Sequence, residues 1–384
     1  MASKALALGV RDLSPTVTRR SKVSLVSGQS IYMGSSMLDG LRPEASQVSF
    51  SAGSLAGLNV VGLLSSLNHY PYGCTEQLTS VALSLVYLNE VAVAAGLASD
   101  DALRGRVNKA LIGILSNQAS NGAFGVWRPN DDGRSLWLDA YVTDFLTRAC
   151  EADYDVPDLA YTQALDNLAN SLPYASDFDD GGEDVAYALY VLTRAGRASI
   201  GDIRYFIDTK LGNFATPFAK TQLGAAAALY GEQRGARTAF AAAISALATQ
   251  SGKSVLYRSD YGSHLRDVAG VLALATDFGK VGVDLDALRS RVAEAASSRA
   301  RLSTQDKVWM LLAADALLKG DKISGLTLDG NPLTTPASAL VEGTTLMNAV
   351  LQVSNTGKDP VELATTVTGP ALVPVVSRRA GASP

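Results

Sequence analysis

The chain has 384 residues, 47% of them hydrophobic, and a formal net charge of −4. This length predicts two or three domains and allows a large buried core. Because the charge is nearly balanced and Lys and Arg form no run, the sequence lacks the electrostatic footprint of nucleic-acid binding or of a membrane surface. The longest apolar stretches, such as residues 81–98, are interrupted by polar residues and are too short to insert into a membrane.

The N-terminal residues contain no secretion signal. Arg11 and Asp12 interrupt the apolar stretch that begins at Ala5 before a signal-peptide hydrophobic region develops. The sequence therefore predicts either a cytosolic chain or a segment of a longer protein. Further along, short alternating runs at residues 22–26 and 47–50 predict strands, which are too few to close a domain within residues 1–50.

Residues 71–77 read Pro-Tyr-Gly-Cys-Thr-Glu-Gln and begin an apolar helix. Positions three apart lie on one helical face, so Gln77 leans back over Cys74. Attack of the Cys74 thiol on the Gln77 amide would expel ammonia and leave an internal thioester, an acyl group ready for transfer to a lysine amine. The helix N-terminus favours a thiolate through its dipole and free N–H groups, so we expect Cys74 to be a good attacker and a good leaving group. The alternative is an ordinary buried cysteine.

The motif P-Y-G-C-T-E-Q, preceded by Tyr70, resembles the thioester motif of alpha-2-macroglobulins and complement-type proteins, and Thr75 resembles the bacterial branch. Residues 136–142 and the surrounding helices also resemble the thioester domain of this family, over roughly residues 50–320. The resemblance implies a broad-spectrum, single-use endopeptidase inhibitor and not an enzyme. A protease cleaves a bait region elsewhere in the full protein, and a lysine of that protease is then acylated through the Gln77 carbonyl.

The same resemblance implies the partners and the location. The partners are the captured proteases, through a covalent amide linkage, and the remaining macroglobulin domains of a full-length protein. The location is the periplasm or the cell surface, with a role in host defence. No cofactor, metal ion or nucleic acid is expected.

Residues beside the nucleophile have supporting roles in this interpretation. Tyr70 and Tyr72 are expected to cover the thioester against water, to fix the helix entry by packing, or both. Gly73 belongs to the motif, and a favourable charge at the helix N-terminus is enough to explain Glu76. In complement-type relatives a histidine redirects the thioester to hydroxyl groups, but residues 122–131, where it would fall, contain none, so direct transfer to amines is implied. Only His69 and His264 occur; packing or capping explains His69, and His264 is expected at a helix start.

The middle of the chain, residues 51–320, predicts helices throughout. Every second helix has a core rich in small apolar residues, and these cores recur at intervals of about 40 residues, the signature of a repeated helical hairpin. The predicted helix starts lie near Ser54, Cys74, Asp100, Arg134, Pro157, Gly182, Gly201, Thr216, Ala236, Ser263, Val283 and Ser303. The pattern predicts an alpha/alpha toroid of about six helical hairpins, with the small-residue helices as the inner ring.

Two further features have competing interpretations. Cys150 is interpreted as a small buried hydrophobe within a helix, and a disulfide with Cys74 is the alternative. Residues 177–180, Asp-Phe-Asp-Asp, match a motif of terpene cyclases, which share a toroid and protonate a double bond with a carboxylic acid such as Asp179 or Asp180. A solvated turn and helix cap is the more common explanation of such a pattern and is preferred for Asp177 and its neighbours. A module whose thioester never forms is a third hypothesis.

Residues 321–384 predict strands again, at 347–353 and 361–367, with a turn at 354–357. We therefore expect residues 1–50 and 321–384 to pair into one small β-sandwich, into which residues 51–320 are inserted. The family resemblance implies that this β domain is CUB-like or macroglobulin-like.

Overall fold

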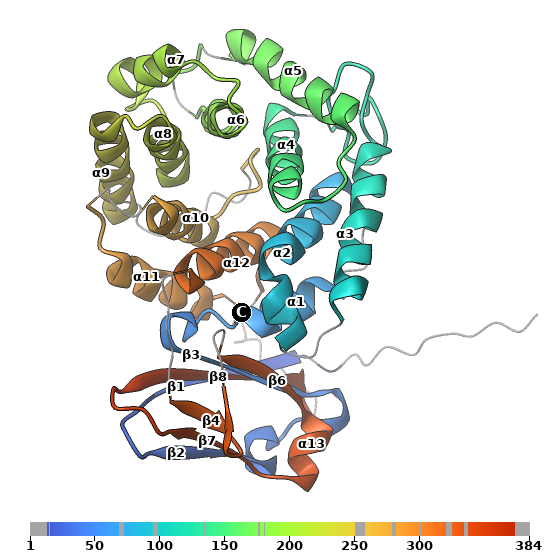
Figure 1. The fold of residues 1–384 in the computed structure, drawn as a ribbon, viewed down its shortest axis with the longest axis vertical. Helices are drawn as coiled ribbons and strands as arrows, with labels where there is room; N and C mark the ends of the chain where they lie inside the picture. The colour runs from blue at the N-terminus through green and yellow to red at the C-terminus, as the bar shows by residue number, and fades with distance from the viewer. Residues whose placement is uncertain are drawn as a thin grey trace, which may run out of the picture. The chain divides into compact units, whose positions relative to one another are not determined.

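The computed structural model describes residues 14, 16–68, 73–94, 99–133, 135–175, 177–179, 181–249, 258–278, 282–299, 301–319, 325–333 and 337–372. The chain divides into two compact units, one made of Met1–Gly62 with Lys322–Pro384 and the other of Leu63–Asp321. As predicted in outline, the protein is mainly helical with small antiparallel sheets (Figure 1). Among the described residues, no helix is both long and apolar enough to cross a membrane.

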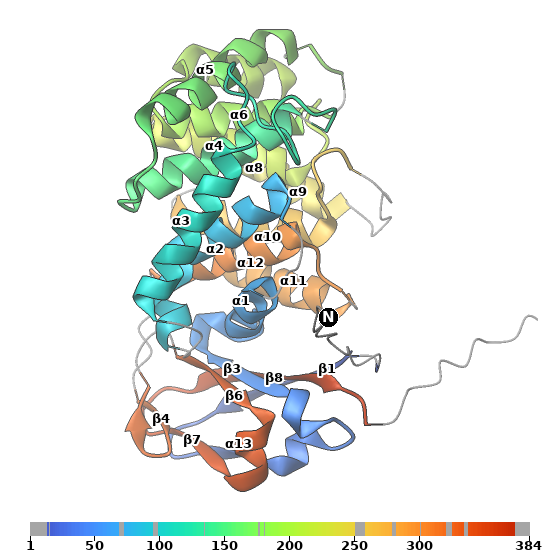
Figure 2. The ribbon, with the colours of Figure 1, turned by 90° about the vertical axis from the view of Figure 1, so that its right-hand side faces the viewer.

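The β unit contains two four-stranded antiparallel sheets, ordered β1-β8-β3-β6 and β2-β7-β4-β5 (Figure 2). The strands are β1 (Thr16–Leu25), β2 (Ser30–Met33), β3 (Gln47–Ala52), β4 (Leu326–Leu328), β5 (Asn331–Pro332), β6 (Ser338–Glu342), β7 (Leu351–Asn355) and β8 (Val361–Pro370). Strands from both chain ends alternate, since β8 lies between β1 and β3. Phe50 of one sheet and Val353 of the other belong to the same buried cluster, so the two sheets share one core.

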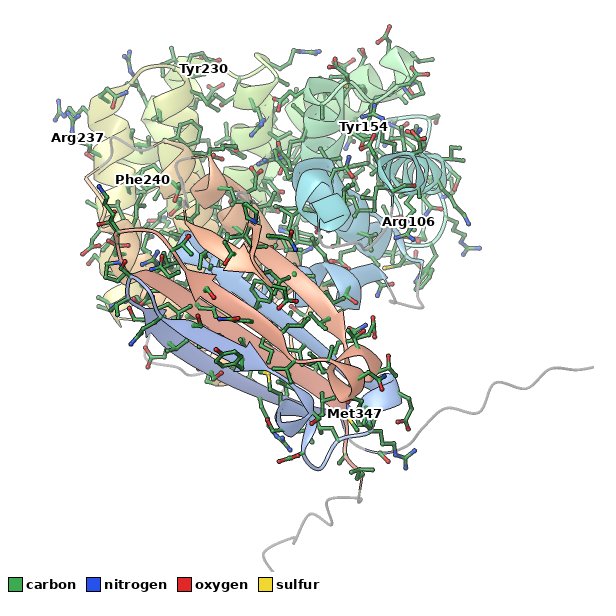
Figure 3. All side chains as sticks on the ribbon, turned by 60° about the horizontal axis from the view of Figure 1, so that its bottom comes forward. Arg106, Tyr154, Tyr230, Arg237, Phe240 and Met347 are labelled. Carbon is green, nitrogen blue, oxygen red and sulfur yellow. The ribbon has the colours of Figure 1, made fainter. Side chains whose placement is uncertain are left out.

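The strand predicted over residues 347–353 is wrong at its start. Residues Gly343–Asn348 form the short helix α13, and β7 begins only at Leu351. Leu346 is buried in the core, whereas Met347 is 52% exposed (Figure 3). The Asn348 side chain donates to the Thr344 carbonyl at 2.9 Å and closes the helical turn.

The helical unit contains helices of 6 to 20 residues joined by connections of varied length. The first helix, α1, begins in the β unit and ends in the helical unit. The helices are α1 (Val60–Asn68), α2 (Thr75–Ala94), α3 (Asp100–Leu115), α4 (Leu136–Glu151), α5 (Asp158–Ala175), α6 (Glu183–Arg194), α7 (Ile200–Tyr205), α8 (Pro217–Leu229), α9 (Gln233–Thr249), α10 (His264–Asp277), α11 (Leu285–Ser297) and α12 (Thr304–Leu318). Serine, threonine or aspartate side chains cap α3, α4, α7, α8, α10, α11 and α12, as the sequence pattern indicates.

The helix predicted to begin near Ser54 begins instead at Val60. Residues Gly53–Leu55 form only a short 3₁₀ turn. Gly57 and Asn59 then adopt positive φ angles of 92° and 51°. A right-handed helix cannot continue through such residues, so it starts directly after them.

Alternate helices of this unit contact one another in a closed cycle. Along the series α2, α4, α6, α8, α10 and α12, each helix contacts the next, and α12 contacts α2 (Figure 1). α4, α6, α8, α10 and α12 bury residues all around, whereas α3, α5, α9 and α11 bury one stripe each. A helix buried all around lies inside the structure, and a helix with one apolar stripe lies at its surface.

Aromatic side chains from the inner helices pack against one another. Trp137 stacks on Tyr141 with ring centroids 5.1 Å apart. Phe218 meets Trp309 edge to face at 4.4 Å, and Trp309 lies 6.4 Å from Tyr187. Rings from α4, α6, α8 and α12 therefore form one buried cluster between these helices.

Charged and phenolic side chains connect α2, α4 and α6 to one another. The buried Arg148 of α4 donates to Asp144 at 2.7 Å, to Tyr87 of α2 at 3.0 Å and to Tyr190 of α6 at 3.2 Å. Its charge is thus paired and hydrogen-bonded, the condition for burying an ion without a large loss of stability.

The close packing of the inner helices can be tested at Gly270 of α10. A Cβ there would lie 2.4 Å from the Phe218 ring, which Trp309 holds from another side. We expect Gly270→Ala to lower the free energy of unfolding by about 1–3 kcal/mol through overpacking. Denaturant unfolding of the whole chain measures this change.

Gly105 of α3 provides the matched control. It is exposed, and an added Cβ would meet no atom within 4 Å. Gly105→Ala should raise the free energy of unfolding by up to about 1 kcal/mol, since alanine favours the helix. Equal effects of the two substitutions would contradict the packing described here.

Candidate functional site

Cys74 lies directly before α2, and its side chain is buried, with 7% exposure. Gly73 is exposed, and a Cβ there would meet no atom within 4 Å, so packing does not require glycine at this position. Tyr70 and Tyr72, predicted to cover the nucleophile, lie outside the described residues, as does His69.

The environment of Cys74 differs from the expected one. Burial raises the pKa of the Cys74 thiol, the backbone N–H groups of Gln77 and Glu76 lower it, and the Glu76 carboxylate raises it. The net result is a pKa above the ordinary value. The N–H groups at the helix N-terminus thus favour the thiolate as predicted, but loss of solvation outweighs them in the free thiol.

Gln77 follows on the first turn of α2. Its side-chain oxygen Oε1 is buried and accepts no hydrogen bond from the described residues. An unpaired buried carbonyl oxygen costs about 1–3 kcal/mol. Among the described residues, the side-chain oxygens of Asn89 and Gln305 are unpaired in the same way. The Gln77 oxygen belongs to the amide group that the sequence singles out as an acyl donor.

Glu76 is buried, with 6% exposure, and does not merely complement the helix dipole at the surface. Its Oε1 accepts hydrogen bonds from Ser80 of the same helix at 2.9 Å, from Thr304 at 2.9 Å and from Gln305 at 2.7 Å. Because Thr304 and Gln305 begin α12, the carboxylate ties the first inner helix to the last. Ser80 in turn shares a 2.8 Å hydrogen bond with Tyr141 of α4.

Thr75 is held by the connection between α3 and α4. Its backbone N–H donates to the Val126 carbonyl at 2.8 Å, and its hydroxyl donates to the Gly125 carbonyl at 2.6 Å. The Asn117 amide donates to the same hydroxyl at 2.8 Å. The residue between Cys74 and Glu76 is thus fixed through both its backbone and its side chain.

The connection that holds Thr75 is organised around the carboxylate of Asp131. That group accepts hydrogen bonds from the backbone N–H groups of Val126, Trp127, Arg128 and Gly133. Although burial raises the pKa of Asp131, these N–H groups lower it below its ordinary range. The sequence pattern does not predict this role of Asp131, although the turn-forming residues Pro129, Asn130 and Gly133 indicate a tight turn here.

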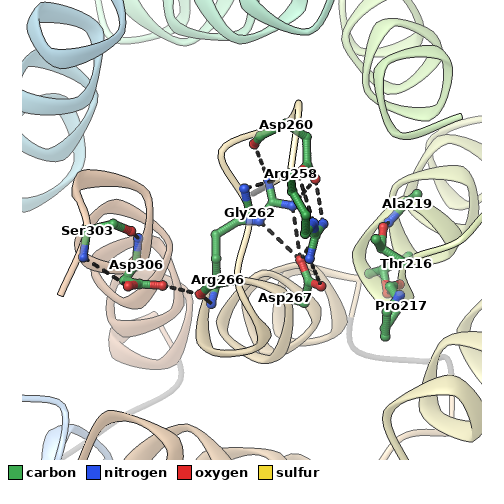
Figure 4. A network of polar contacts seen from close by, with 12 residues as sticks. Thr216, Pro217, Ala219, Arg258, Asp260, Gly262, Arg266, Asp267, Ser303 and Asp306 are labelled. Carbon is green, nitrogen blue, oxygen red and sulfur yellow. Dashed lines mark hydrogen bonds and ion pairs between the residues drawn. The ribbon is translucent and has the colours of Figure 1, made fainter. Parts of the chain in front are cut away.

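A second polar cluster lies where α10 begins (Figure 4). Asp260 pairs with Arg258 and with Arg266, and Asp267 pairs with the same two arginines. Ser263, the cap of α10, is hydrogen-bonded to Asp306 of α12. The first turns of α10 and α12 are therefore joined, as those of α2 and α12 are at Glu76. Sequence periodicity does not reveal these pairs, because they connect loops and helix starts.

Other predicted residues lie away from this site. Asp177 and Asp179 are exposed, Asp177 pairs with Lys210 at 3.7 Å, and Asp180 lies outside the described residues. Solvent-facing carboxylates do not suit the enclosed acid that a terpene cyclase needs. His264 is the first residue of α10, as predicted. Within the described ranges, no group of three or more His, Cys, Asp or Glu residues is placed to hold a metal ion.

Cys150 is exposed, so its interpretation as a buried hydrophobe is wrong. It lies in the last turn of α4, where the inward face of the helix is taken by Ala149 and Arg148. Cys74 and Cys150 are both free, and the alternative disulfide is not formed.

The connection between α2 and α12 can be tested at Gln305. We expect Gln305→Ala to lower the free energy of unfolding by about 1.5–3 kcal/mol, because the buried Glu76 carboxylate loses a donor. The exposed Gln233, at the start of α9, is the matched control, and Gln233→Ala should change stability by less than about 0.5 kcal/mol. Denaturant unfolding measures both, and a loss at Gln305 no larger than that at Gln233 would contradict the role given to this contact.

Comparison with known proteins gives consistent matches. Residues 51–178 match the model of the A-macroglobulin TED domain. The chain is 28% identical over 376 residues to an alpha-2-macroglobulin of Escherichia coli, covering 94% of this chain and 22% of that protein. It is 27% identical to one of Xylella fastidiosa, covering 81% and 20%. The chain thus spans about a fifth of the length of these relatives.

Solved structures give the same result. The native conformation of E. coli alpha-2-macroglobulin matches with a TM-score of 0.78 at 27% identity, over 95% of this chain and 24% of that one. Salmonella alpha-2-macroglobulin reacted with methylamine matches with a TM-score of 0.75 at 28% identity, over 94% and 24%. The trypsin-activated E. coli protein matches with a TM-score of 0.60 at 26% identity, over 95% and 25%.

Proposed function

We propose, from the premise that this chain belongs to the alpha-2-macroglobulin family, that Cys74 and Gln77 form an internal thioester that captures amines. The Cys74 sulfur attacks the side-chain carbonyl carbon of Gln77, and the carbon–nitrogen bond breaks. The amide nitrogen leaves as ammonia, taking up the thiol proton. The reaction is an acyl transfer within the chain and needs no cofactor.

A lysine of a target protein then opens the bond. Its neutral amine attacks the Gln77 carbonyl carbon, the carbon–sulfur bond breaks, and Cys74 leaves as a thiolate that takes up the proton released by the amine. An amide between Gln77 and the lysine remains. Because the thioester is not regenerated, the chain acts once and does not turn over as an enzyme.

One observation supports this proposal above all: the buried Cys74 directly precedes α2, and the unpaired buried oxygen of Gln77 lies on the first turn of that helix. Each buried polar group without a partner calls for an explanation, and an acyl-donor role supplies one for Gln77. The Salmonella relative has been reacted with methylamine, a small amine of the kind this chemistry accepts.

At the level of the whole protein, we propose that this chain is the thioester-containing part of a broad-spectrum protease inhibitor. The relatives are four to five times longer, so the remaining macroglobulin domains would sense the protease and present it to Cys74 and Gln77. Periplasmic or cell-surface location and a role in host defence belong to the same proposal. Since residues 122–131 contain no histidine, the acceptors would be amines and not hydroxyl groups.

The domain assignment follows from the same proposal. The closed cycle of α2, α4, α6, α8, α10 and α12, of which all but α12 contact an outer helix, supports an alpha/alpha toroid of about six hairpins as the thioester domain, over about residues 51–320. Residues 1–50 and 321–384 would form the CUB-like or macroglobulin-like β domain. Tyr70 and Tyr72 would cover the bond, and Glu76 and Gly73 would support its geometry.

The thioester can be tested by intact mass and thiol titration of the purified chain before and after methylamine. We expect a native mass lighter than the encoded one by one ammonia and a single titratable thiol, that of the exposed Cys150. Methylamine should be incorporated once, and one further thiol should appear. A native mass equal to the encoded one, with two thiols and no methylamine uptake, would refute the proposal and favour a non-reactive interaction module.

Two variants separate the bond from other thiol chemistry. Cys74→Ala should retain the encoded mass for its sequence and incorporate no methylamine. Cys150→Ala should behave as the parent chain does, except that no thiol is titrated before methylamine is added. A thioester that had already been hydrolysed would be recognised by its intact mass, because hydrolysis converts Gln77 to Glu and leaves a mass slightly above the encoded one.

A further inference from the structure

The connection between α3 and α4 forms a tight turn around one carboxylate. Asp131 accepts hydrogen bonds from Trp127 at 2.7 Å, from Val126 and Gly133 at 3.1 Å, and from Arg128 at 3.3 Å, all through backbone N–H groups. Hydrogen bonds to an ionised acceptor are about twice as strong as neutral ones. Asp131 is therefore the group on which the shape of this turn depends.

Side chains would not fit in two places of the turn. A Cβ at Gly125 would lie 1.8 Å from the Arg128 carbonyl oxygen, and a Cβ at Gly133 would lie 2.7 Å from the Val126 side chain. The chain thus folds closely back on itself around Asp131. The glycines permit this turn but do not hold it closed, so the carboxylate is needed for that.

Val126 links this turn to the candidate site. Its N–H donates to Asp131, and its carbonyl accepts the N–H of Thr75 at 2.8 Å. The neighbouring Gly125 carbonyl accepts the Thr75 hydroxyl at 2.6 Å. One residue therefore stands between the carboxylate of Asp131 and the residue that follows Cys74.

We propose that Asp131 is a positioning residue for the bond between Cys74 and Gln77, acting through Val126 and Thr75. This inference rests on the proposed function. With Thr75 fixed at its N–H and its hydroxyl, the first turn of α2 keeps the Cys74 sulfur beside the Gln77 carbonyl carbon and keeps both in their buried position. When the turn opens, the hydrogen bonds from Thr75 to Val126 and Gly125 are lost, and water and small amines reach the bond.

The variant that tests this is Asp131→Asn, which keeps the size of the side chain and removes its charge. The matched control is Asp132→Asn, which removes the same charge from the next residue, where the side chain is exposed. The rate of methylamine-induced thiol release is measured for both and for the parent chain. We expect release about tenfold faster in Asp131→Asn, because the turn loses hydrogen bonds to a charged group, and unchanged in Asp132→Asn.

A second measurement reports the coupling without depending on the thioester. Hydrogen exchange of the Thr75 and Val126 amides is followed in protein that has been treated with methylamine, so that no thioester is present whether or not one formed. We expect both amides to exchange faster in Asp131→Asn than in the parent chain, while amides in the middle of α4 keep their protection. A general loss of stability would instead speed exchange throughout the unit.

A double-mutant cycle tests the route through Thr75. Thr75→Val removes the hydroxyl bond to Gly125 and leaves Asp131 in place. If Asp131 acts through these hydrogen bonds, the effects of the two substitutions on thiol release are not additive. Should Asp131→Asn fail to fold, Asp131→Ser, which keeps one acceptor oxygen, takes its place in each measurement.

The outcomes separate the two proposals. Thiol release and Thr75 exchange at parental rates in Asp131→Asn, or additive effects in the cycle, overturn the role of Asp131 and leave the thioester standing. A parent chain that incorporates no methylamine overturns the thioester, and with it the bond that Asp131 would position. The exchange measurement then still decides whether Asp131 holds Thr75.

Discussion

The helical unit depends on a buried carboxylate at the place where its first and last inner helices meet. Glu76 of α2 receives donors from Thr304 and Gln305 of α12, residues 228 and 229 positions away in the sequence. A buried charge without such donors would cost several kcal/mol, on the order of the whole stability of a domain. Only the closed cycle of inner helices brings α12 to this carboxylate. The contact that closes the cycle therefore also fixes the residue between Thr75 and Gln77 in the candidate site.

The two ends of the inner helices are held by different means. At one end, Glu76 joins the first turn of α2 to that of α12, and Asp306 of α12 is hydrogen-bonded to Ser263, the cap of α10. At the other end, Arg148 links α4 to α2 and α6. Aromatic rings from α6, α8 and α12 pack against one another. The candidate site is therefore supported by contacts from several helices, as the proposed thioester would require.

Burial of Cys74 acts differently on the closed and the open forms of the proposed thioester. The sulfur of a thioester carries no charge, so burial does not penalise it. After opening, the sulfur is a thiolate or a thiol, and loss of solvation disfavours the thiolate, which agrees with the raised pKa of the free thiol. If the proposed thioester forms, burial would slow the departure of sulfur and preserve the bond. The N–H groups of Glu76 and Gln77 partly offset this effect at the moment of attack.

The amino-acid sequence by itself determined the features that depend on neighbouring residues. Serine and threonine caps and 3.6-residue periodicity placed most helix starts close to where they occur, from Asp100 to Ser303. Small residues at regular intervals separated the inner helices from the outer ones. The spacing of Cys74 and Gln77 placed both on one turn of α2, because helix geometry brings positions three apart together.

Tertiary structure alone decided the contacts between distant residues. The burial of Glu76, the four N–H groups around Asp131 and the pairs around Asp260 each depend on backbone paths that no local pattern specifies. The exposure of Cys150 depends on which face of α4 turns inward, and the raised pKa of Cys74 depends on how deeply the packed helices bury it. Local preferences act over a few residues, whereas burial and charge pairing are set by the whole fold, so the sequence singled out Cys74 and Gln77 as candidates but not the groups that surround them.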